Sequence, residues 1–488
     1  MMLELKNPAL LRTESYINGQ WINADSGATF DVTDPATGKV VAKVSDLGAD
    51  ETRRAIEAAS AAWPAWRGTP VKERAKTLRR WYDLVIANTD DLARILTAEQ
   101  GKPLSEAQTE IVYSANYIEW FSEEAKRAYG DVIAPPAGDR RIVVIKQPVG
   151  VTCSITPWNF PCAMIARKMA PALAAGCPFI AKPAQETPLS ALALAVLAEE
   201  AGIPAGIFNI VTGENAPAIG AEMTSNPLVR KFTFTGSTAV GKLLQAQCAQ
   251  TMKKTSMELG GNAPFIVFDD AHLDEAVKGA IICKYRNAGQ TCVCANRILV
   301  QEGVYEAFAS KFTAAVNNLT LGNGFDGHTD LGPMITAKAI KKVESLVEDA
   351  LQKGAQTLVA GGPSALGDSF YAPVVLGDAS DQMKLFTEEI FGPVAPLYRF
   401  STEEEAVRMA NDTEFGLASY FYSRDIGRIC RVAEGLEYGM VGINEGVISN
   451  EMAPFGGVKE SGQGREGSKY GIDDYLEIKY LCLGGIDQ

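Results

Sequence analysis

The sequence predicts an α/β protein in which helices cover parallel sheets. Between residues 149 and 250, short β-rich runs alternate with helical runs, and a second alternation of this kind begins after Asn262. Such alternation is typical of parallel sheets covered by helices. The 488 residues also exceed what one core usually holds, so two or three domains are expected.

The first 129 residues have a different character. Short strands and turns fill the first fifty residues, and Asn18-Gly19 between two β-like runs is a hairpin signal. From residue 50 to about 129 the pattern is helical. Asp50 suits the N-cap of the first helix, and Gly101 suits the end of a later one.

Strands and helices then alternate in a first α/β unit. A strand at residues 141–146 is expected to precede this unit. The strands of the unit are expected at 149–155, 178–181, 207–211 and 231–235, and the helices at 162–174, 189–201 and 238–250. Ligands of parallel sheets bind beyond the carboxyl ends of the strands. Three of those ends carry Pro157-Trp158-Asn159-Phe160, Lys182-Pro183-Ala184-Gln185 and Thr235-Gly236-Ser237-Thr238.

The turn at Gly236 is a candidate anion site. It runs through Ser237 to Gly241 and opens directly into a helix, whose free N–H groups favour an anion such as phosphate. Lys182, at the end of a neighbouring strand, adds a cation. The turn is not a GxGxxG motif, however, and a glycine before a helix is also ordinary turn punctuation.

A candidate nucleophile lies in the second α/β unit, which has strands expected at 264–268 and 297–300. The helical run 273–286 ends at Gly289, and Cys292 follows among small and polar residues. A cysteine at the end of an element, near backbone N–H groups, is expected to ionise more readily than one in an apolar core. The alternative is an inert, buried cysteine.

The base for such a nucleophile has to be a carboxylate. The only histidines are His272 and His328, which leaves almost nothing for a Ser-His-Asp or Cys-His site or a histidine-rich metal site. Glu258 stands at the junction of the two α/β units. Partial burial there is expected to raise its pKa toward working pH.

Charge and composition restrict the partners. A formal charge of −13 disfavours nucleic acid and anionic membranes. No apolar run approaches a membrane span, and the N-terminal residues do not read as a signal peptide. Nine cysteines without scaffold-like spacing favour reduced thiols in a cytoplasmic compartment.

Taken together and in this order, Asn159, the Phe234-Thr235-Gly236-Ser237-Thr238 turn, Glu258, Cys292 and Glu389-Ile390-Phe391-Gly392-Pro393 resemble the NAD(P)-dependent aldehyde dehydrogenase superfamily. The resemblance implies a Rossmann-like cofactor domain, an α/β catalytic domain and a small β arm that forms homo-oligomers, either dimers or tetramers. The ranges expected are 1–125 and 149–258 for the cofactor domain, 259–470 for the catalytic domain, and 126–148 and 471–488 for the arm.

The resemblance also implies roles for single residues. Cys292 would attack the aldehyde carbon, Asn159 would stabilise the oxyanion, and Glu258 would activate water, with Lys168 and Glu466 as a proton path. The residues that match the family's cofactor contacts are Trp158, Lys182, Gln185, Gly236, Ser237, Gly241, Leu259, Glu389 and Phe391. Many NAD-preferring relatives have glutamate where this chain has Gln185, so NADP is the expected preference, with NAD accepted.

Within the family, the runs around Asn159, Cys292 and Ser449 resemble succinate-semialdehyde dehydrogenases. This implies oxidation of succinate semialdehyde, or alternatively of another short carboxylated aldehyde such as glutarate semialdehyde. Arg167 and Arg286 are expected to face one substrate tunnel, and the resemblance adds Ser449 as a third carboxylate contact. An arginine there without a protein partner would need an anion, which a substrate carboxylate supplies. The alternative is that either arginine pairs with a protein carboxylate and does not meet the substrate.

Three further interpretations stay open. Cys294, two residues from Cys292, is a candidate for a reversible disulfide with it, although a small packing residue would look the same. A CoA-acylating relative would pass the thioester to a thiol instead of water, which Glu258 disfavours. A catalytically silent protein with the same fold is disfavoured by the intact Cys292, Glu258 and Asn159.

Overall fold

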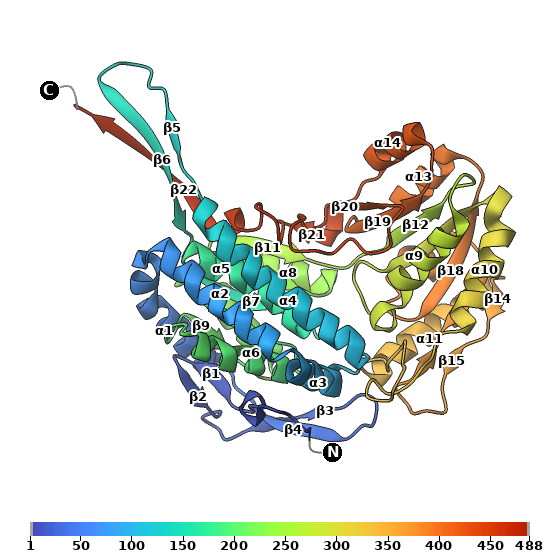
Figure 1. Ribbon diagram of the computed structural model, residues 1–488, viewed down its shortest axis with the longest axis horizontal. Helices are drawn as coiled ribbons and strands as arrows, with labels where there is room; N and C mark the ends of the chain where they lie inside the picture. The colour runs from blue at the N-terminus through green and yellow to red at the C-terminus, as the bar shows by residue number, and fades with distance from the viewer. Residues whose placement is uncertain (1–2, 486–488) are drawn as a thin grey trace.

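A computed structural model describes residues 3–485, which form two α/β units side by side and a projecting β arm (Figure 1). The first unit is built on an eight-stranded sheet of order β2-β1-β9-β8-β7-β10-β11-β21. Its strands are β1 (Ser15–Ile17), β2 (Gln20–Ile22), β7 (Val151–Ile155), β8 (Phe179–Lys182), β9 (Phe208–Ile210), β10 (Val229–Thr235), β11 (Lys254–Glu258) and β21 (Gly462–Gln463). Strands β9-β8-β7-β10-β11 are parallel, so their carboxyl ends share one edge.

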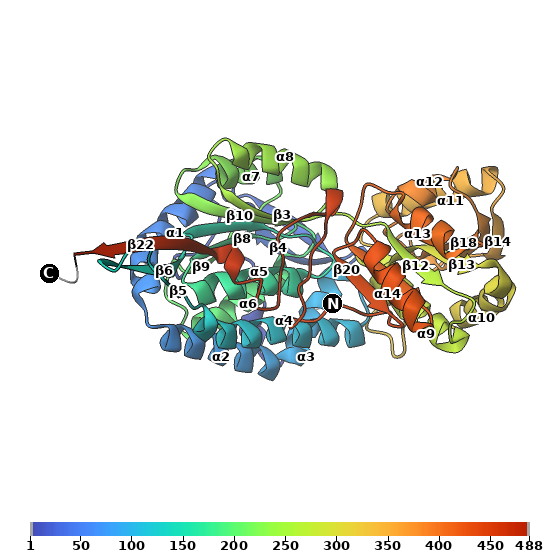
Figure 2. The ribbon, with the colours of Figure 1, turned by 90° about the horizontal axis from the view of Figure 1, so that it is seen from above.

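Helices cover both faces of this sheet (Figure 2). One face carries α1 (Ala49–Gly68), α7 (Ala216–Ser225) and α8 (Thr238–Ala249), and the other carries α2 (Val71–Ala87), α3 (Thr89–Gln100), α4 (Leu104–Glu124), α5 (Pro161–Ala175) and α6 (Pro188–Ala201). A separate hairpin, β3 (Thr29–Thr33) with β4 (Val40–Ser45), lies beside the N-terminal strands. The predicted parallel sheet with covering helices is confirmed.

The second unit has a seven-stranded sheet of order β14-β17-β18-β13-β12-β19-β20. Its strands are β12 (Ala263–Val267), β13 (Ala295–Gln301), β14 (Gln356–Val359), β17 (Val374–Ala379), β18 (Val394–Phe400), β19 (Ala418–Tyr422) and β20 (Met440–Ile443). Its helices are α9 (Leu273–Tyr285), α10 (Tyr305–Asn317), α11 (Ala337–Gln352), α12 (Lys384–Thr387), α13 (Glu403–Asn411) and α14 (Ile426–Gly435), and a short strand pair, β15 (Gly362–Pro363) with β16 (Tyr371–Ala372), lies outside the sheet.

The side chains along β12 alternate between two apolar clusters, one on each face of this sheet. Phe265 and Val267 pack in one apolar cluster with α9 and α10, while Ile266 packs in the other cluster with α11, α13 and α14. Successive side chains of a strand point to opposite faces, so a strand buried on both faces needs apolar residues at every position.

The arm is a three-stranded antiparallel sheet of β5 (Asp131–Ile133), β6 (Arg140–Pro148) and β22 (Leu476–Gly484). It projects away from the first unit in Figure 1. These strands fall within the ranges 126–148 and 471–488 expected from the sequence, of which residues 486–488 lie outside the described part, as do residues 1–2. No helix of the described residues is long and apolar enough to cross a membrane.

Local expectations had mixed outcomes. The hairpin at Asn18-Gly19 is confirmed, with both residues at positive φ between β1 and β2. The N-cap prediction for Asp50 is wrong. Helix α1 begins two residues earlier than this prediction, at Ala49 with Gly48 as its N-cap, because the Glu51 carboxylate accepts the Gly48 N–H at 3.0 Å and completes the cap.

The elements of the first unit that were not expected from the sequence include β11, β21 and α7. Strand β11 reads Lys-Thr-Ser-Met-Glu and has no apolar alternation, although its last three residues are buried. Ser256 is tolerated in the interior because its hydroxyl donates to the Asp474 carboxylate at 2.7 Å. A buried strand that satisfies its polar side chains in this way gives no hydrophobic signal.

Candidate active site

The candidate site lies at the carboxyl edge of the first sheet. Lys182 and Glu258 are the last residues of β8 and β11, while Asn159 follows β7 and Gly236 follows β10. The strand register brings these ends together, since Ile155 pairs with Lys182 and Thr235 pairs with Glu258. The parallel order thus brings residues of four separate segments to one edge.

Cys292 lies where two cavities meet. The larger cavity has a volume of about 470 Å³ and the smaller about 260 Å³, and the Cys292 side chain lines both. Such an atom can be reached from either side. A substrate in one cavity and a second reactant in the other could therefore meet at this sulfur.

The backbone that leads to Cys292 is unusual. After α9, the 3₁₀ turn η3 (Arg286–Gly289) holds Asn287 and Ala288 at φ 53° and 55°. Non-glycine residues rarely adopt this left-handed conformation, and they do so where surrounding contacts enforce it. Here the Asn287 N–H donates to a Glu106 carboxylate oxygen at 2.9 Å, and Gln100 Nε2 donates to Asn287 Oδ1 at 3.0 Å. The sequence analysis did not identify Asn287, Gln100 or Glu106.

Asn159 is tied to the same turn. Its Nδ2 donates to the Gln290 carbonyl at 3.0 Å, and its own carbonyl accepts from Asn287 Nδ2 at 3.1 Å and from Lys102 Nζ at 2.8 Å. An amide nitrogen carries two hydrogens. The second N–H of Asn159 therefore remains for a ligand in the smaller cavity, which Asn159 lines together with Cys292.

The thiol of Cys292 is not readily ionised in this structure. Burial raises its pKa to about 12; the Arg167 charge opposes the shift, and the charges of Glu389 and Glu258 add to it. The expectation of an easily ionised thiol is thus wrong. The Arg167 charge does not compensate for the loss of water and for the two nearby carboxylates, so a base has to take the proton.

Glu258 has the properties of that base. Its side chain is buried, and neither carboxylate oxygen has a hydrogen-bond partner among residues 3–485. Burial raises the pKa of Glu258 well above its usual range, the Glu466 charge raises it further, and Arg167 and Lys168 oppose. The predicted direction of this shift agrees with the structure. A carboxyl group with a raised pKa can accept and release a proton near neutral pH.

Glu466 and Lys168, the two residues expected to form the proton path, are in contact. Its carboxylate forms ion pairs with both Lys168 and Arg167, and all three side chains are buried. Burial by itself raises the pKa of Glu466, but the charges of Arg167 and Lys168 lower it overall. Glu466 therefore stays ionised, and it is this negative charge that helps to keep a proton on Glu258.

One premise about the arginines is wrong. Arg167 does not lack a protein partner, because it pairs with Glu466 and its guanidinium lies 4.3 Å from the centre of the Phe455 ring. Its Nη2 nevertheless has no hydrogen-bond partner among the described residues. Residues 299 positions apart meet here, so no local pattern in the sequence indicates the pair.

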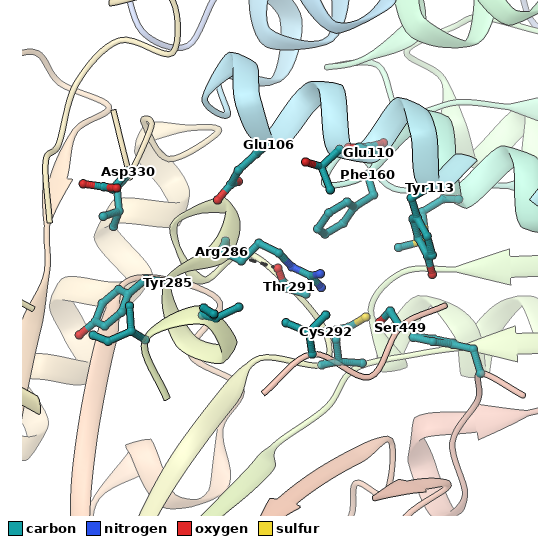
Figure 3. A pocket seen from close by; sticks show the side chains of 18 of the residues that line it. Glu106, Glu110, Tyr113, Phe160, Tyr285, Arg286, Thr291, Cys292, Asp330 and Ser449 are labelled. Atoms are coloured by element: carbon teal, nitrogen blue, oxygen red, sulfur yellow. Dashed lines mark hydrogen bonds between the residues drawn. The ribbon is translucent and has the colours of Figure 1, made fainter. Parts of the chain in front are cut away.

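Arg286, in contrast, forms no ion pair with any residue of the described range. It lines the larger cavity with Arg167, Ser449 and Cys292, so the three residues expected to bind substrate do come together around the sulfur. Figure 3 shows the Arg286 side chain crossing this cavity between Glu106 and Cys292. Its guanidinium lies 5.3 Å from the centre of the Phe160 ring.

The smaller cavity is lined by most of the residues expected to contact the cofactor. Six of the nine residues expected to contact the cofactor line it, namely Trp158, Gly236, Ser237, Leu259, Glu389 and Phe391. The rings of Trp158 and Phe391 pack edge to face with centroids 5.7 Å apart. Helix α8 begins beside the cavity without a side-chain cap, so its first N–H groups are free to bind phosphate.

The other three expected cofactor residues do not line this cavity. Lys182 is buried at the end of β8, and burial lowers its pKa to about 8. Gln185 is exposed beyond it. Gly241 packs α8 against Leu259, where an added Cβ would come within 2.3 Å of Leu259 Cδ2. A larger residue at position 241 would therefore clash with Leu259.

Comparison with known proteins identifies the class. A model of the aldehyde dehydrogenase family matches residues 21–481, and the chain belongs to this family. The resemblance inferred from the sequence is confirmed.

Individual relatives are similar over the whole chain. A 3-sulfolactaldehyde dehydrogenase of Pseudomonas putida is 62% identical over 487 residues, covering 100% of both chains. A glutarate-semialdehyde dehydrogenase of Pseudomonas aeruginosa is 62% identical, covering 99% of this chain and 100% of the relative. The crystal structure of a succinate-semialdehyde dehydrogenase from Burkholderia pseudomallei is 63% identical, with a TM-score of 0.97 and coverage of 98% and 99%.

Proposed function

We propose that the protein oxidises succinate semialdehyde to succinate with NAD(P)⁺. The observation that carries this proposal is Arg286, a cation without an ion-pair partner among the described residues, in the same cavity as Cys292. A guanidinium held in a cavity favours a carboxylate as its ligand. The relatives support an anionic substrate, because each is named for an aldehyde that also bears a carboxylate or sulfonate.

Glutarate semialdehyde is the second candidate substrate. It is one methylene longer than succinate semialdehyde, and the cavity volume of about 470 Å³ leaves room for it. One methylene in an apolar pocket changes binding by only about 1 to 3 kcal/mol. The cavity therefore favours short anionic aldehydes as a class and discriminates less between aldehydes of different chain length.

In the proposed reaction, Glu258 takes the proton of Cys292 and the thiolate attacks the aldehyde carbon. The free N–H of Asn159 and the main-chain N–H of Cys292 stabilise the oxyanion, at about 3 kcal/mol for a donor of this kind. The bound cofactor supplies the hydride acceptor, and Cys292 is left as a thioester. Glu258 then activates water to release the acid, and Glu466 and Lys168 relay the proton.

For the cofactor, we propose a preference for NADP with NAD accepted. The free N–H groups at the start of α8 would hold the pyrophosphate. The Trp158–Phe391 pair would form the wall of the site beside the nicotinamide. At the strand end, Lys182 has no ion-pair partner in residues 3–485, and the neutral Gln185 does not repel a 2′-phosphate. Glu186, which acts electrostatically on Lys182, is a nearby carboxylate that the sequence analysis did not consider.

We further propose that the arm joins copies of the chain into a homo-oligomer. Val132, Ile478 and Tyr480 expose 81%, 73% and 60% of their surface in the isolated chain. Apolar side chains grouped on a projecting sheet are typical of an interaction surface. All nine cysteines are free thiols, which supports a reducing compartment such as the cytoplasm.

The role of Glu258 is testable through the variant Glu258→Gln. We expect steady-state turnover to fall by about 100- to 10,000-fold, because water is no longer activated. A single burst of reduced cofactor should remain, but it should be slow at pH 7. Its rate should rise about tenfold per pH unit, since the thiolate fraction of Cys292 grows with pH below its raised pKa. Stopped-flow absorbance measures both phases, and a burst at the parent's rate at pH 7 would exclude Glu258 as the base for the thiol.

The substrate assignment is testable through Arg286→Ala. We expect kcat/KM for succinate semialdehyde to fall by about 10- to 150-fold, the value of one charge-assisted hydrogen bond. The value for butanal, which has no carboxylate, should change little. Arg167→Ala is the comparison variant: it also removes one of the two ion pairs of the buried Glu466, so kcat/KM should fall for both substrates. Equal losses for the two aldehydes in Arg286→Ala would remove the main support for an anionic substrate.

The cofactor preference is testable through Gln185→Glu. A carboxylate at this position should repel the 2′-phosphate, so the ratio of kcat/KM with NADP to that with NAD should fall at least about tenfold. Glu186→Gln is the matched control, because it removes the neighbouring carboxylate and should leave NADP preferred. The assignment of Gln185 fails if its substitution leaves the ratio unchanged.

The arm proposal is testable through Ile478→Asp. A charge on the face of the arm that carries Ile478 and Tyr480 should weaken self-association and lower the molar mass measured by light scattering after size exclusion. The control is Met252→Asp, which changes a side chain that is 88% exposed in the turn after α8. If Ile478→Asp keeps the mass of the parent oligomer, the arm is not the interface.

A further inference from the structure

A second reactive pair lies next to the nucleophile and is not used by the proposed reaction. Lys284, in the last turn of α9, is fully buried, and its Nζ lies 4.0 Å from the sulfur of Cys294. Cys294 is also buried, and its sulfur lies 3.3 Å from the Gly289 carbonyl oxygen. No carboxylate of residues 3–485 forms an ion pair with Lys284.

A buried lysine without a carboxylate partner is costly. Removing an ammonium group from water costs several kcal/mol unless a partner compensates. The side chain that faces the Lys284 nitrogen is Cys294. Burial lowers the pKa of Lys284 and raises the pKa of the Cys294 thiol, while the charge of each group opposes the shift of the other. The Lys284 nitrogen therefore faces the Cys294 sulfur both when the two groups are charged and when they are neutral.

We propose that Cys294 and Lys284 form an oxidation site at which peroxide joins the two side chains through one oxygen atom. A thiolate beside a cation is the form of cysteine that peroxide oxidises. The nitrogen is close enough to capture the oxidised sulfur. A bridge with an inserted oxygen spans more of the present 4.0 Å gap than a direct S–N bond would.

The chemistry balances with two molecules of hydrogen peroxide. The first oxidises the Cys294 thiol to a sulfenic acid and is reduced to water. The second removes one hydrogen from the sulfenic O–H and one from the Lys284 amine, so that an O–N bond forms and two more waters are released. The product is an S–O–N bridge, with three waters formed in all.

Such a bridge would act on the loop that carries Cys292. Lys284 and Cys294 stand at the two ends of a segment that contains Asn287, Gln290 and Cys292. Drawing its ends together would disturb the hydrogen bonds from Asn159 and Asn287 to the Gln290 carbonyl. Catalytic activity should therefore fall on oxidation and return with a dithiol reductant.

The direct test is mass spectrometry of the full-length protein after treatment with hydrogen peroxide. The bridge adds one oxygen and removes two hydrogens, so a species heavier by about 14 Da is expected. Trypsin should then fail to cut after Lys284, leaving residues 279–286 linked to residues 287–297. Tandem spectra of this linked pair identify the two joined residues without the need for a variant.

Variants separate this bridge from other products. Lys284→Met and Cys294→Ser should abolish the heavier species, while Lys278→Met, an exposed lysine of the same helix, should keep it. Cys292→Ser should also keep it, because the bridge does not use the nucleophile. Lys284→Arg is a second test that keeps the charge but should not form the bridge.

The proposal is overturned by any of three results. The first is oxidised protein that is lighter by about 2 Da, which indicates a disulfide such as Cys292–Cys294. The second is Cys294 found only as its sulfinic or sulfonic acid. The third is a species heavier by about 14 Da that persists in Lys284→Met. The mass readout does not depend on the substrate, so these results are independent of the proposed function.

Discussion

The candidate site depends on one buried ion pair, Lys102 with Glu110. The Lys102 ammonium bonds Glu110 at 2.6 Å and the Asn159 carbonyl at 2.8 Å, while the other Glu110 oxygen accepts N–H groups at the start of α5, including that of Cys162 at 3.0 Å. This pair fixes the segment between β7 and α5. Through Asn287, the same carbonyl is bonded to the turn that leads to Cys292. These bonds therefore fix the position of Asn159 relative to Cys292, although the two residues belong to different units.

A second buried group of charges sets the proton chemistry. Glu466 forms ion pairs with Arg167 and Lys168, and its negative charge is one reason for the raised pKa of Glu258. The thiol and the carboxyl group are both kept neutral by the same desolvation. A protonated Glu258 cannot accept the thiol proton, so Glu258 first has to release its own proton, for which Lys168 and Glu466 are the proposed path. Burial, which opposes ionisation of Cys292 at rest, is therefore compatible with its use as a nucleophile when Glu258 accepts the proton.

The sequence located the chemical groups but not their environments. Cys292, Asn159 and Arg286 could be placed because local signals, such as strand ends and a helix end, stand next to them. The ion pair of Arg167 could not, because Glu466 is distant in sequence. The pKa direction predicted for Glu258 was right because a position between two sheets implies burial. The one for Cys292 was wrong because the same burial, and the nearby carboxylates, depend on packing that a cysteine motif does not reveal.

The larger cavity favours a ligand with one negative group over a ligand with two. Arg167 is paired with Glu466, and Lys168 balances that carboxylate, so Arg286 is the cation left for a ligand at the cavity wall. Glu106 and Asp330 line the same cavity and would repel a second negative group placed beyond Arg286. A short aldehyde with a single acidic group fits this arrangement of charge. The acidic side chains in the cavity wall therefore disfavour a substrate with a second negative group, while Arg286 favours the first.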